Sequence, residues 1–285
     1  MMKVAVVGNG VMGKGIVEIL LCYTKLAGIE SIVWISRDTE SSIASTSLLS
    51  RKVVKFLKTK SEIDFPPSES MAALQITSDF SALKSAELVI EAVSEDKDVK
   101  HDIMAKIAAV VDDTTIVASN TSSLSITELA ANFRKPENFL GLHFFNPAPM
   151  MSLVEVVRGL TTCESIIEKA VVFSRSIGKE PVVVNEAPGF VVNRMLIPMI
   201  NEAIAIYSEG VADIKQIDKA MKLGANHPIG PLSLSDLIGN DVVLSILETL
   251  YLETRDNKYR PHTLLKKYVR ANKLGRKTKS GFYDY

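Results

Sequence analysis

The chain has 285 residues, 47% of them hydrophobic and 23% charged, which is enough for one large domain or two of ordinary size. Lys and Arg number 33, as do Asp and Glu, a balance that favours neither a nucleic-acid partner nor a membrane surface. The distant Cys22 and Cys163 are expected to be free thiols of a reducing compartment. The N-terminus has no signal-peptide pattern, and no window approaches the roughly 18 apolar residues of a membrane span. We therefore expect a cytoplasmic protein.

Short β-rich runs alternate with helical periodicity over the first two thirds of the chain. Several runs are continuously apolar, which is typical of strands buried on both faces of a sheet. The alternation predicts an α/β domain with a parallel sheet over residues 1–185. The predicted strands are 3–8, 31–36, 74–77, 86–93, 115–120, 139–144, 153–157 and 180–185, with helices at 12–22, 96–110 and 164–177.

The pattern changes after about Asn185. Strand signals disappear, and apolar residues recur at helical spacing. A second, helical domain is therefore predicted over residues 186–285, beginning near the EAPG motif. Its predicted helices are 190–208, 213–223, 232–253 and 261–272.

A glycine-rich turn follows the first predicted strand and opens a helix. Its first glycine permits the tight turn, the second lets a pyrophosphate approach the backbone, and the third lets the helix pack closely on the strand. The helix N-terminus then faces the phosphates. A plain glycine turn is the alternative, but the strand–turn–helix context favours dinucleotide binding. The residues expected to bind the cofactor here are Gly8, Gly10, Val11, Met12 and Gly13.

The end of the second strand bears on the choice of cofactor. NAD-specific sites carry an Asp or Glu there for the ribose 2′-hydroxyl, and this chain has Ser36. A small hydroxyl followed by the guanidinium of Arg37 suits a 2′-phosphate, which an acid would repel. The residues favour NADP(H), with NAD(H) possible. Two alternatives stay open: a later strand end with Asp38 as the ribose acid, or an ordinary solvated turn.

A histidine and a glutamate lie on consecutive predicted strands. His143 is near the carboxyl end of 139–144, where ligands bind in open α/β sheets, and Glu155 lies 12 residues further on. If 146–149 reverses the chain, the two side chains can meet. A buried carboxylate needs a partner, and such a pair can work as general base and orienter. On this segment alone a structural pair fits equally well, and the glycine loop upstream favours the catalytic interpretation.

Six motifs resemble, in order and spacing, those of the 3-hydroxyacyl-CoA dehydrogenase family. They are GNGVMGKGI, VIEAVSED, ASNTSSLSIT, GLHFFNPAPMMSLVEVV, EAPGFVVNRMLIPMINEA and GANHPIGPLSLSDLIG, and the resemblance extends to the terminal GFYDY. It implies an α/β Rossmann-type N-terminal domain, an all-α C-terminal domain that forms a homodimer, and interconversion of (S)-3-hydroxyacyl-CoA and 3-oxoacyl-CoA. The chain is most similar to short bacterial members, whose substrates are 3-hydroxybutyryl-CoA and acetoacetyl-CoA.

The resemblance implies roles for four residues in the reaction. His143 would be the catalytic base and Glu155 its orienting acid, while Ser122 and Asn193 would contact the substrate. Ser122 could instead cap a helix, because SSLSITE contains a capping-box pattern. Asn193 lies near the start of a predicted helix, although helix propensity does not favour asparagine there.

Further residues would lie near the cofactor if the resemblance holds. Glu95 and Lys100 match positions beside the nicotinamide half, and Asn120 and Asn146 would also be close to the dinucleotide. Family members that use NAD have an acid where this chain has Ser36, and a short insertion precedes it. This departure favours the 2′-phosphate interpretation.

The basic segment 50–60 suggests how coenzyme A could be bound. Lys52 and Lys55 could attract its phosphates, although a solvated helix face explains the charges equally well. An alternative activity is a dehydrogenase of the same fold acting on a free hydroxy acid of the gulonate type. A non-enzymatic dinucleotide-binding protein is the other alternative. No metal-binding pattern is evident.

Overall fold

The computed structural model describes residues 2–59 and 65–285. Lys60, the last residue of the basic segment 50–60, lies outside the described residues. The chain divides into two compact units, Met1–Glu186 and Ala187–Tyr285, and each is described by itself below.

The N-terminal unit is built on an eight-stranded sheet with the order β3-β2-β1-β4-β5-β6-β7-β8. All eight predicted strands are confirmed, with each end within two residues of its predicted place. The β-branched and apolar runs form strands because the sheet buries them, most completely in β4 and β6. The strands are β1 (Met2–Val7), β2 (Ile29–Ile35), β3 (Leu74–Thr77), β4 (Leu88–Glu91), β5 (Ile116–Ser119), β6 (Phe139–Phe144), β7 (Leu153–Arg158) and β8 (Glu180–Asn185).

The first six strands are parallel and follow the strand order of a Rossmann-type sheet. β7 runs antiparallel to β6, and β8 runs parallel to β7. The predicted parallel sheet therefore contains one antiparallel pair, at the place where a reversal at 146–149 was considered. The connection between Phe144 and Leu153 is too short for the crossover that a parallel pair needs, so it reverses the chain.

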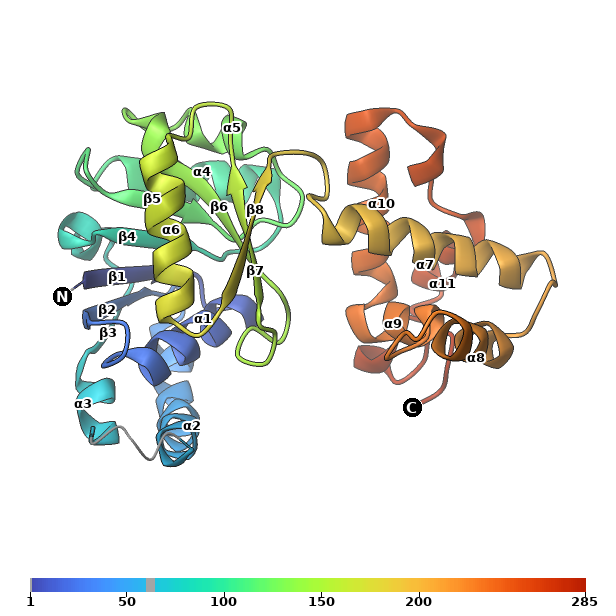
Figure 1. Cartoon of the computed structure of the whole chain (residues 1–285), viewed down its shortest axis with the longest axis horizontal. Coiled ribbons are helices and arrows are strands. Elements are labelled where there is room, and N and C mark those ends of the chain that lie inside the picture. The colour runs from blue at the N-terminus through green and yellow to red at the C-terminus, as the bar shows by residue number, and fades with distance from the viewer. Residues whose placement is uncertain (1, 60–64) are drawn as a thin grey trace. The chain divides into compact units, whose positions relative to one another are not determined.

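Helices cover both faces of this sheet. α1 and α6 pack on one face with α2 and α3 beside α1, and α4 and α5 lie on the other (Figure 1). The core between α1 and the sheet includes Trp34, which is fully buried. The helices are α1 (Val11–Tyr23), α2 (Thr39–Lys58), α3 (Pro67–Ala72), α4 (Lys97–Ala108), α5 (Ile126–Ala130) and α6 (Glu164–Ser176).

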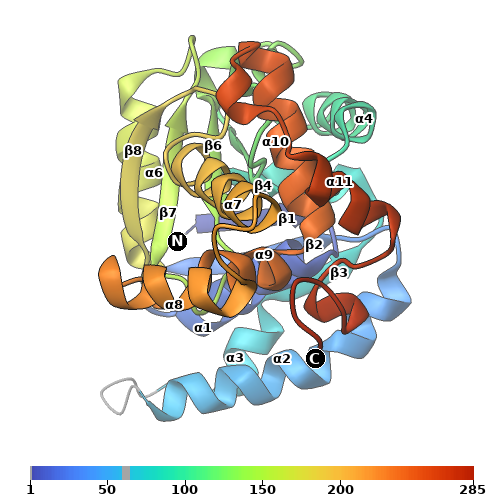
Figure 2. The ribbon, with the colours of Figure 1, turned by 90° about the vertical axis from the view of Figure 1, so that its right-hand side faces the viewer.

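The C-terminal unit is helical, as predicted. Its helices α7, α8, α9, α10 and α11 all contribute to one apolar core, and Figure 2 shows their arrangement. The single helix predicted over 232–253 is in fact two, because Gly239 between them has φ +106°, which no right-handed helix accommodates. No helix within the described ranges is long and apolar enough to cross a membrane. The helices are α7 (Val192–Ser208), α8 (Ile214–Gly224), α9 (Pro231–Ile238), α10 (Asn240–Thr254) and α11 (Thr263–Arg270).

Candidate functional site

Gly8 and Gly10 lie between β1 and α1, and Gly13 lies in the first turn of α1; the structure gives a different reason for glycine at each position. Gly8 has φ +121°, and a Cβ added there would lie 2.5 Å from the carbonyl oxygen of Ala92. A Cβ on Gly13 would lie 2.1 Å from the carbonyl oxygen of Gly8, so the helix packs directly on the turn. A Cβ on Gly10 would meet nothing within 4 Å. Gly10 thus faces open space, as close approach by a pyrophosphate requires.

A cavity of about 590 Å³ opens in front of this loop. Gly10 is also the N-cap of α1 and offers no side-chain acceptor, so the first N–H groups of the helix are available to an anion. These features fit a dinucleotide. The cavity is lined by residues 7–12, residues 35–37, Ser78, Phe80, residues 92–94 and three residues of α4, Val99, Ile103 and Lys106.

The turn after β2 is held by its own polar groups. Buried Ser36 donates its hydroxyl to the carbonyl of Asp38 at 2.7 Å and accepts from the hydroxyl of Ser42 at 2.7 Å. The carboxylate of Asp38 caps α2 by accepting from the backbone N–H of Ser41 at 2.9 Å. Arg37 is exposed and lines the cavity. The guanidinium is therefore the group of this turn that can meet a charged ligand.

His143 and Glu155 stand directly opposite each other on the antiparallel strands β6 and β7. The Nδ1 atom of His143 lies 2.7 Å from Oε2 of Glu155, and the two residues are only 5% and 1% exposed. A carboxylate can only accept, so in the neutral imidazole Nδ1 carries the proton and Nε2 the lone pair. The ring centroids of Phe145 and His143 lie 4.5 Å apart. Such a pair can take up and return a proton through Nε2.

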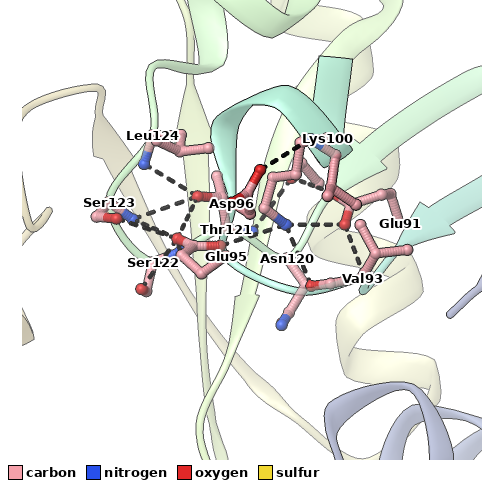
Figure 3. Close-up of polar contacts among 12 residues, drawn as sticks. Glu91, Val93, Glu95, Asp96, Lys100, Asn120, Thr121, Ser122, Ser123 and Leu124 are labelled. Atoms are coloured by element: carbon pink, nitrogen blue, oxygen red, sulfur yellow. Dashed lines mark hydrogen bonds and ion pairs between the residues drawn. The ribbon is translucent and has the colours of Figure 1, made fainter. Parts of the chain in front are cut away.

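Glu95 ties the loop after β4 to the loop after β5 (Figure 3). Its Oε1 accepts from the hydroxyl of Thr121 at 2.6 Å, and from the backbone N–H groups of Ser122 at 2.7 Å and Ser123 at 3.1 Å. The Ser122 hydroxyl donates to the same oxygen at 3.1 Å. Burial by itself raises the pKa of Glu95, but the charge of Lys100 and these hydrogen bonds outweigh it and hold that pKa below its usual value.

The alternative role of Ser122 as a helix cap is wrong. α5 begins later, and its N-cap is Ser125, whose side chain accepts from the backbone N–H of Glu128 at 3.0 Å. Ser125 therefore supplies the N-cap of the Ser-x-x-Glu pattern, while the carboxylate of Glu128 pairs with Lys97 at 2.8 Å. Ser122 remains in the loop, half-buried and joined to Glu95.

Lys100 is buried between two carboxylates. Its Nζ lies 2.8 Å from Oε1 of Glu91 and 3.2 Å from Oε2 of Glu95, and its side chain is 1% exposed. Glu91 is also buried, and its Oε2 accepts from the hydroxyl of Ser119 at 2.6 Å. Lys100 thus orients Glu95, and its direct contact with a cofactor stays a prediction.

Two predicted cofactor residues lie near the end of β6. The side-chain oxygen of Asn120 accepts from the backbone N–H of Phe144 at 2.9 Å, which joins the ends of β5 and β6. Asn146 is exposed in the loop between β6 and β7. Among the described residues, Glu95, Lys100, Asn120 and Asn146 lie outside the lining of the cavity at the glycine loop. Their cofactor roles stay predictions.

The residues predicted to bind the substrate are divided between the two units. Lys52 pairs with Glu18 of α1 at 2.6 Å, so part of its charge is already balanced. Lys55 is exposed on the same helix, α2. Asn193 is the second residue of α7, in the other unit, so its place relative to His143 stays a prediction.

The sequence interpretation missed several residues of the cavity. Ser78 directly follows β3, so the rule that ligands bind at the carboxyl ends of strands could have found it. Lys106 and Ile103 carry no such signal, because they lie within α4 and reach the cavity only through its packing on the sheet.

A Rossmann-type unit with a dinucleotide cavity and a buried His–Glu pair is typical of dehydrogenases. The chain matches two family models, 3-hydroxyacyl-CoA dehydrogenase, NAD binding domain, over residues 3–187, and 3-hydroxyacyl-CoA dehydrogenase, C-terminal domain, over residues 189–285. The chain therefore belongs to the 3-hydroxyacyl-CoA dehydrogenase family, whose members are oxidoreductases acting on CH–OH groups.

Relatives cover the whole chain. It is 48% identical to a 3-hydroxybutyryl-CoA dehydrogenase of Clostridioides difficile, over 100% of this chain and 99% of the relative. It is 37% identical to the mitochondrial hydroxyacyl-coenzyme A dehydrogenase of Homo sapiens, over 99% and 90%. The crystal structure of an (S)-3-hydroxybutyryl-CoA dehydrogenase from Ralstonia eutropha is similar with a TM-score of 0.92 at 40% identity, over 100% of this chain and 99% of that one.

Proposed function

We propose that this chain is a dehydrogenase that interconverts (S)-3-hydroxybutyryl-CoA and acetoacetyl-CoA. Two relatives of 45% and 48% identity that match it end to end are named 3-hydroxybutyryl-CoA dehydrogenase, and a third of 40% identity is named probable 3-hydroxybutyryl-CoA dehydrogenase. The observation that carries the proposal is the buried His143–Glu155 pair, 2.7 Å apart at the carboxyl end of β6 in a dinucleotide-binding unit. A proton acceptor at this edge of the sheet is what oxidation of a hydroxyl requires.

In oxidation, His143 Nε2 takes the proton from the 3-hydroxyl, and in reduction it returns a proton to the forming alkoxide. A dinucleotide held at the turn of Gly8, Gly10 and Gly13 would supply the hydride chemistry at C3. Glu155 stabilises the imidazolium that forms and holds the ring in one orientation. The pair therefore serves both directions of the reaction.

Ser122 and Asn193 are the proposed donors to the 3-oxygen and the thioester carbonyl. The Ser122 hydroxyl donates to Oε1 of Glu95 at 3.1 Å, and the backbone N–H of Ser122 donates to the same oxygen at 2.7 Å. The hydroxyl can therefore rotate towards a substrate while the loop keeps its anchor. Lys55, whose side chain is exposed, is the better placed of the two candidate lysines for the phosphates of coenzyme A, since Lys52 is paired with Glu18.

NADP(H) is the proposed cofactor, with NAD(H) as the alternative. Arg37 is exposed in the cavity at the end of β2, where an acid would exclude a 2′-phosphate. The Ser36 hydroxyl is occupied with the Asp38 carbonyl, so the guanidinium is the proposed phosphate partner. Asp38 caps α2, which disfavours it as the ribose acid.

Cofactor choice is tested by initial rates of acetoacetyl-CoA reduction with NADPH and NADH at equal concentration. We expect faster reduction with NADPH. Arg37→Ala should raise the KM for NADPH roughly 10- to 100-fold, the equivalent of a charge-assisted hydrogen bond of about 1.5–3 kcal/mol, and leave that for NADH nearly unchanged. Arg134→Ala, at an exposed arginine far along the chain, is the control. A strong preference of the wild-type protein for NADH would overturn the proposal.

Substrate class is tested by comparing acetoacetyl-CoA with a free sugar acid of the gulonate type. We expect turnover of the CoA thioester only. Oxidation of the sugar acid without turnover of the thioester would replace the proposed activity with the alternative one.

A homodimer through residues 187–285 and a cytoplasmic location are also proposed. Several large apolar side chains of the C-terminal unit are exposed, among them Met195, Val211 and Leu223 at 72%, 71% and 76%, and burying such side chains against a second copy would favour association. Sedimentation at micromolar concentration should give a dimer, and a monomer throughout would reject this part of the proposal.

A further inference from the structure

Lys179, which follows α6, is a buried lysine outside the site described so far. Only 5% of the residue is exposed, and Nζ donates to the carbonyl oxygens of Ala148 and Met151, each at 2.7 Å. Burial lowers its pKa. Among the residues that the structure describes, no carboxylate forms an ion pair with it. Burying an ammonium group costs free energy unless its N–H groups donate hydrogen bonds. The carbonyl oxygens of Ala148 and Met151 accept these hydrogen bonds from Lys179.

Both carbonyls belong to the loop between β6 and β7, the strands of His143 and Glu155. Within this loop the backbone N–H groups of Met150 and Met151 donate to the carbonyl of Pro147 at 2.9 and 3.1 Å. The residue after Lys179 continues the attachment, since the N–H of Glu180 donates to the carbonyl of Ser152 at 2.8 Å. Lys179 therefore joins the end of α6 to the turn of the His143–Glu155 hairpin.

The same loop meets α1 on another side. A Cβ added to Gly15 would lie 3.1 Å from Cβ of Ala148 and 3.4 Å from Cδ of Pro149. α1 begins at the glycine loop, so its contact with Ala148 links the hairpin to the dinucleotide-binding turn. Lys179 thus holds the loop between β6 and β7 through two carbonyl oxygens, and α1 packs closely against the side chains of Ala148 and Pro149.

We propose that Lys179 is a positioning residue for the reaction: by holding the loop between β6 and β7 against α1, it sets His143 relative to the dinucleotide-binding turn. Lys179 acts through the loop and touches none of the reacting groups. This inference rests on the proposed function, because it concerns the placement of the proposed base. A displacement of about 1 Å far from the chemistry can cost on the order of 100-fold in rate, so a loosened loop is sufficient to matter.

Lys179→Met, which keeps the apolar stem and removes the donors, tests the proposal. We expect kcat for acetoacetyl-CoA reduction to fall roughly 10- to 100-fold while the KM for acetoacetyl-CoA changes little. Hydrogen exchange at the amides of Met150 and Met151 should become faster, a readout that needs neither substrate nor cofactor. Lys169→Met, at an exposed lysine of α6, is the matched control and should change neither quantity.

Gly15→Ala presses on the loop from α1 and supplies a second perturbation in case Lys179→Met does not fold. It should also lower kcat, and the double variant should lose less than the product of the two single effects, because both act on one loop. Wild-type kcat and wild-type exchange in Lys179→Met overturn the inference, as does wild-type kcat in Gly15→Ala if the first variant is unfolded. A wild-type protein inactive on acetoacetyl-CoA rejects the proposed function instead.

Discussion

Glu155→Gln separates the electrostatic role of Glu155 from its packing role. Glutamine has nearly the same shape, and its amide oxygen can still accept from Nδ1 of His143 in this buried position. What is lost is the negative charge facing the imidazolium that forms as the proton is taken. Hydrogen bonds to charged groups contribute about 1.5–3 kcal/mol and neutral ones about 0.5–1.5 kcal/mol. The difference, about 1–2 kcal/mol, predicts a chemical step about 5- to 30-fold slower.

The assay is acetoacetyl-CoA reduction with protiated and 4-deuterated reduced dinucleotide. A slower chemical step should lower kcat and raise the primary isotope effect on it, while the KM for the dinucleotide stays the same. Glu168→Gln, at an exposed glutamate of α6, is the control for removal of a surface charge. If Glu155→Gln has the rate, isotope effect and pH–rate profile of the wild type, the orienting role of Glu155 is wrong.

Three further predictions concern the cofactor loop and the buried ion pairs. Gly10→Ala should weaken dinucleotide binding about tenfold or more without loss of stability, because its Cβ meets only open space, whereas Gly13→Ala should destabilise the fold by a clash with the turn; calorimetric binding and urea unfolding separate the two. Lys100→Met should lower the free energy of unfolding by about 3–5 kcal/mol because Glu91 is left buried and unpaired, with the fluorescence of the single tryptophan as probe; an unchanged midpoint would show that the pair is not needed. The pKa of Glu95 lies below its ordinary 4.5 in the folded protein. Ionised Glu95 therefore contributes in full to the free energy of unfolding above about pH 4.5, and this contribution is lost as the pH falls through the lowered pKa. Glu95→Gln should lose less stability on acidification than the wild type, and equal losses would contradict this.

The strands and most helices were predictable because their patterns are local. Runs such as 139–144 are continuously apolar, and burial on both faces of the sheet is what selects them. The error at 232–253 has a local cause too: the left-handed backbone at Gly239 interrupts a sequence whose apolar spacing is helical on both sides. Spacing alone does not reveal a glycine's φ.

The site was predictable only where its members follow strands or motifs. His143 and Glu155 lie on consecutive strands, so their meeting could be inferred from one reversal of the chain. Lys179 and Ala148 are 31 positions apart and meet only because α6 returns the chain to the edge of the sheet. The two hydrogen bonds of the Ser36 hydroxyl likewise depend on how α2 leaves the sheet, which no local pattern encodes.

The most direct measurement is the single-turnover reduction of acetoacetyl-CoA by protein loaded with NADPH, wild type against His143→Ala. Loss of the proposed general acid and base should slow this step roughly 10²- to 10⁴-fold, with the Kd for the dinucleotide unchanged. A His143→Ala variant that reduces acetoacetyl-CoA at the wild-type rate would contradict the account.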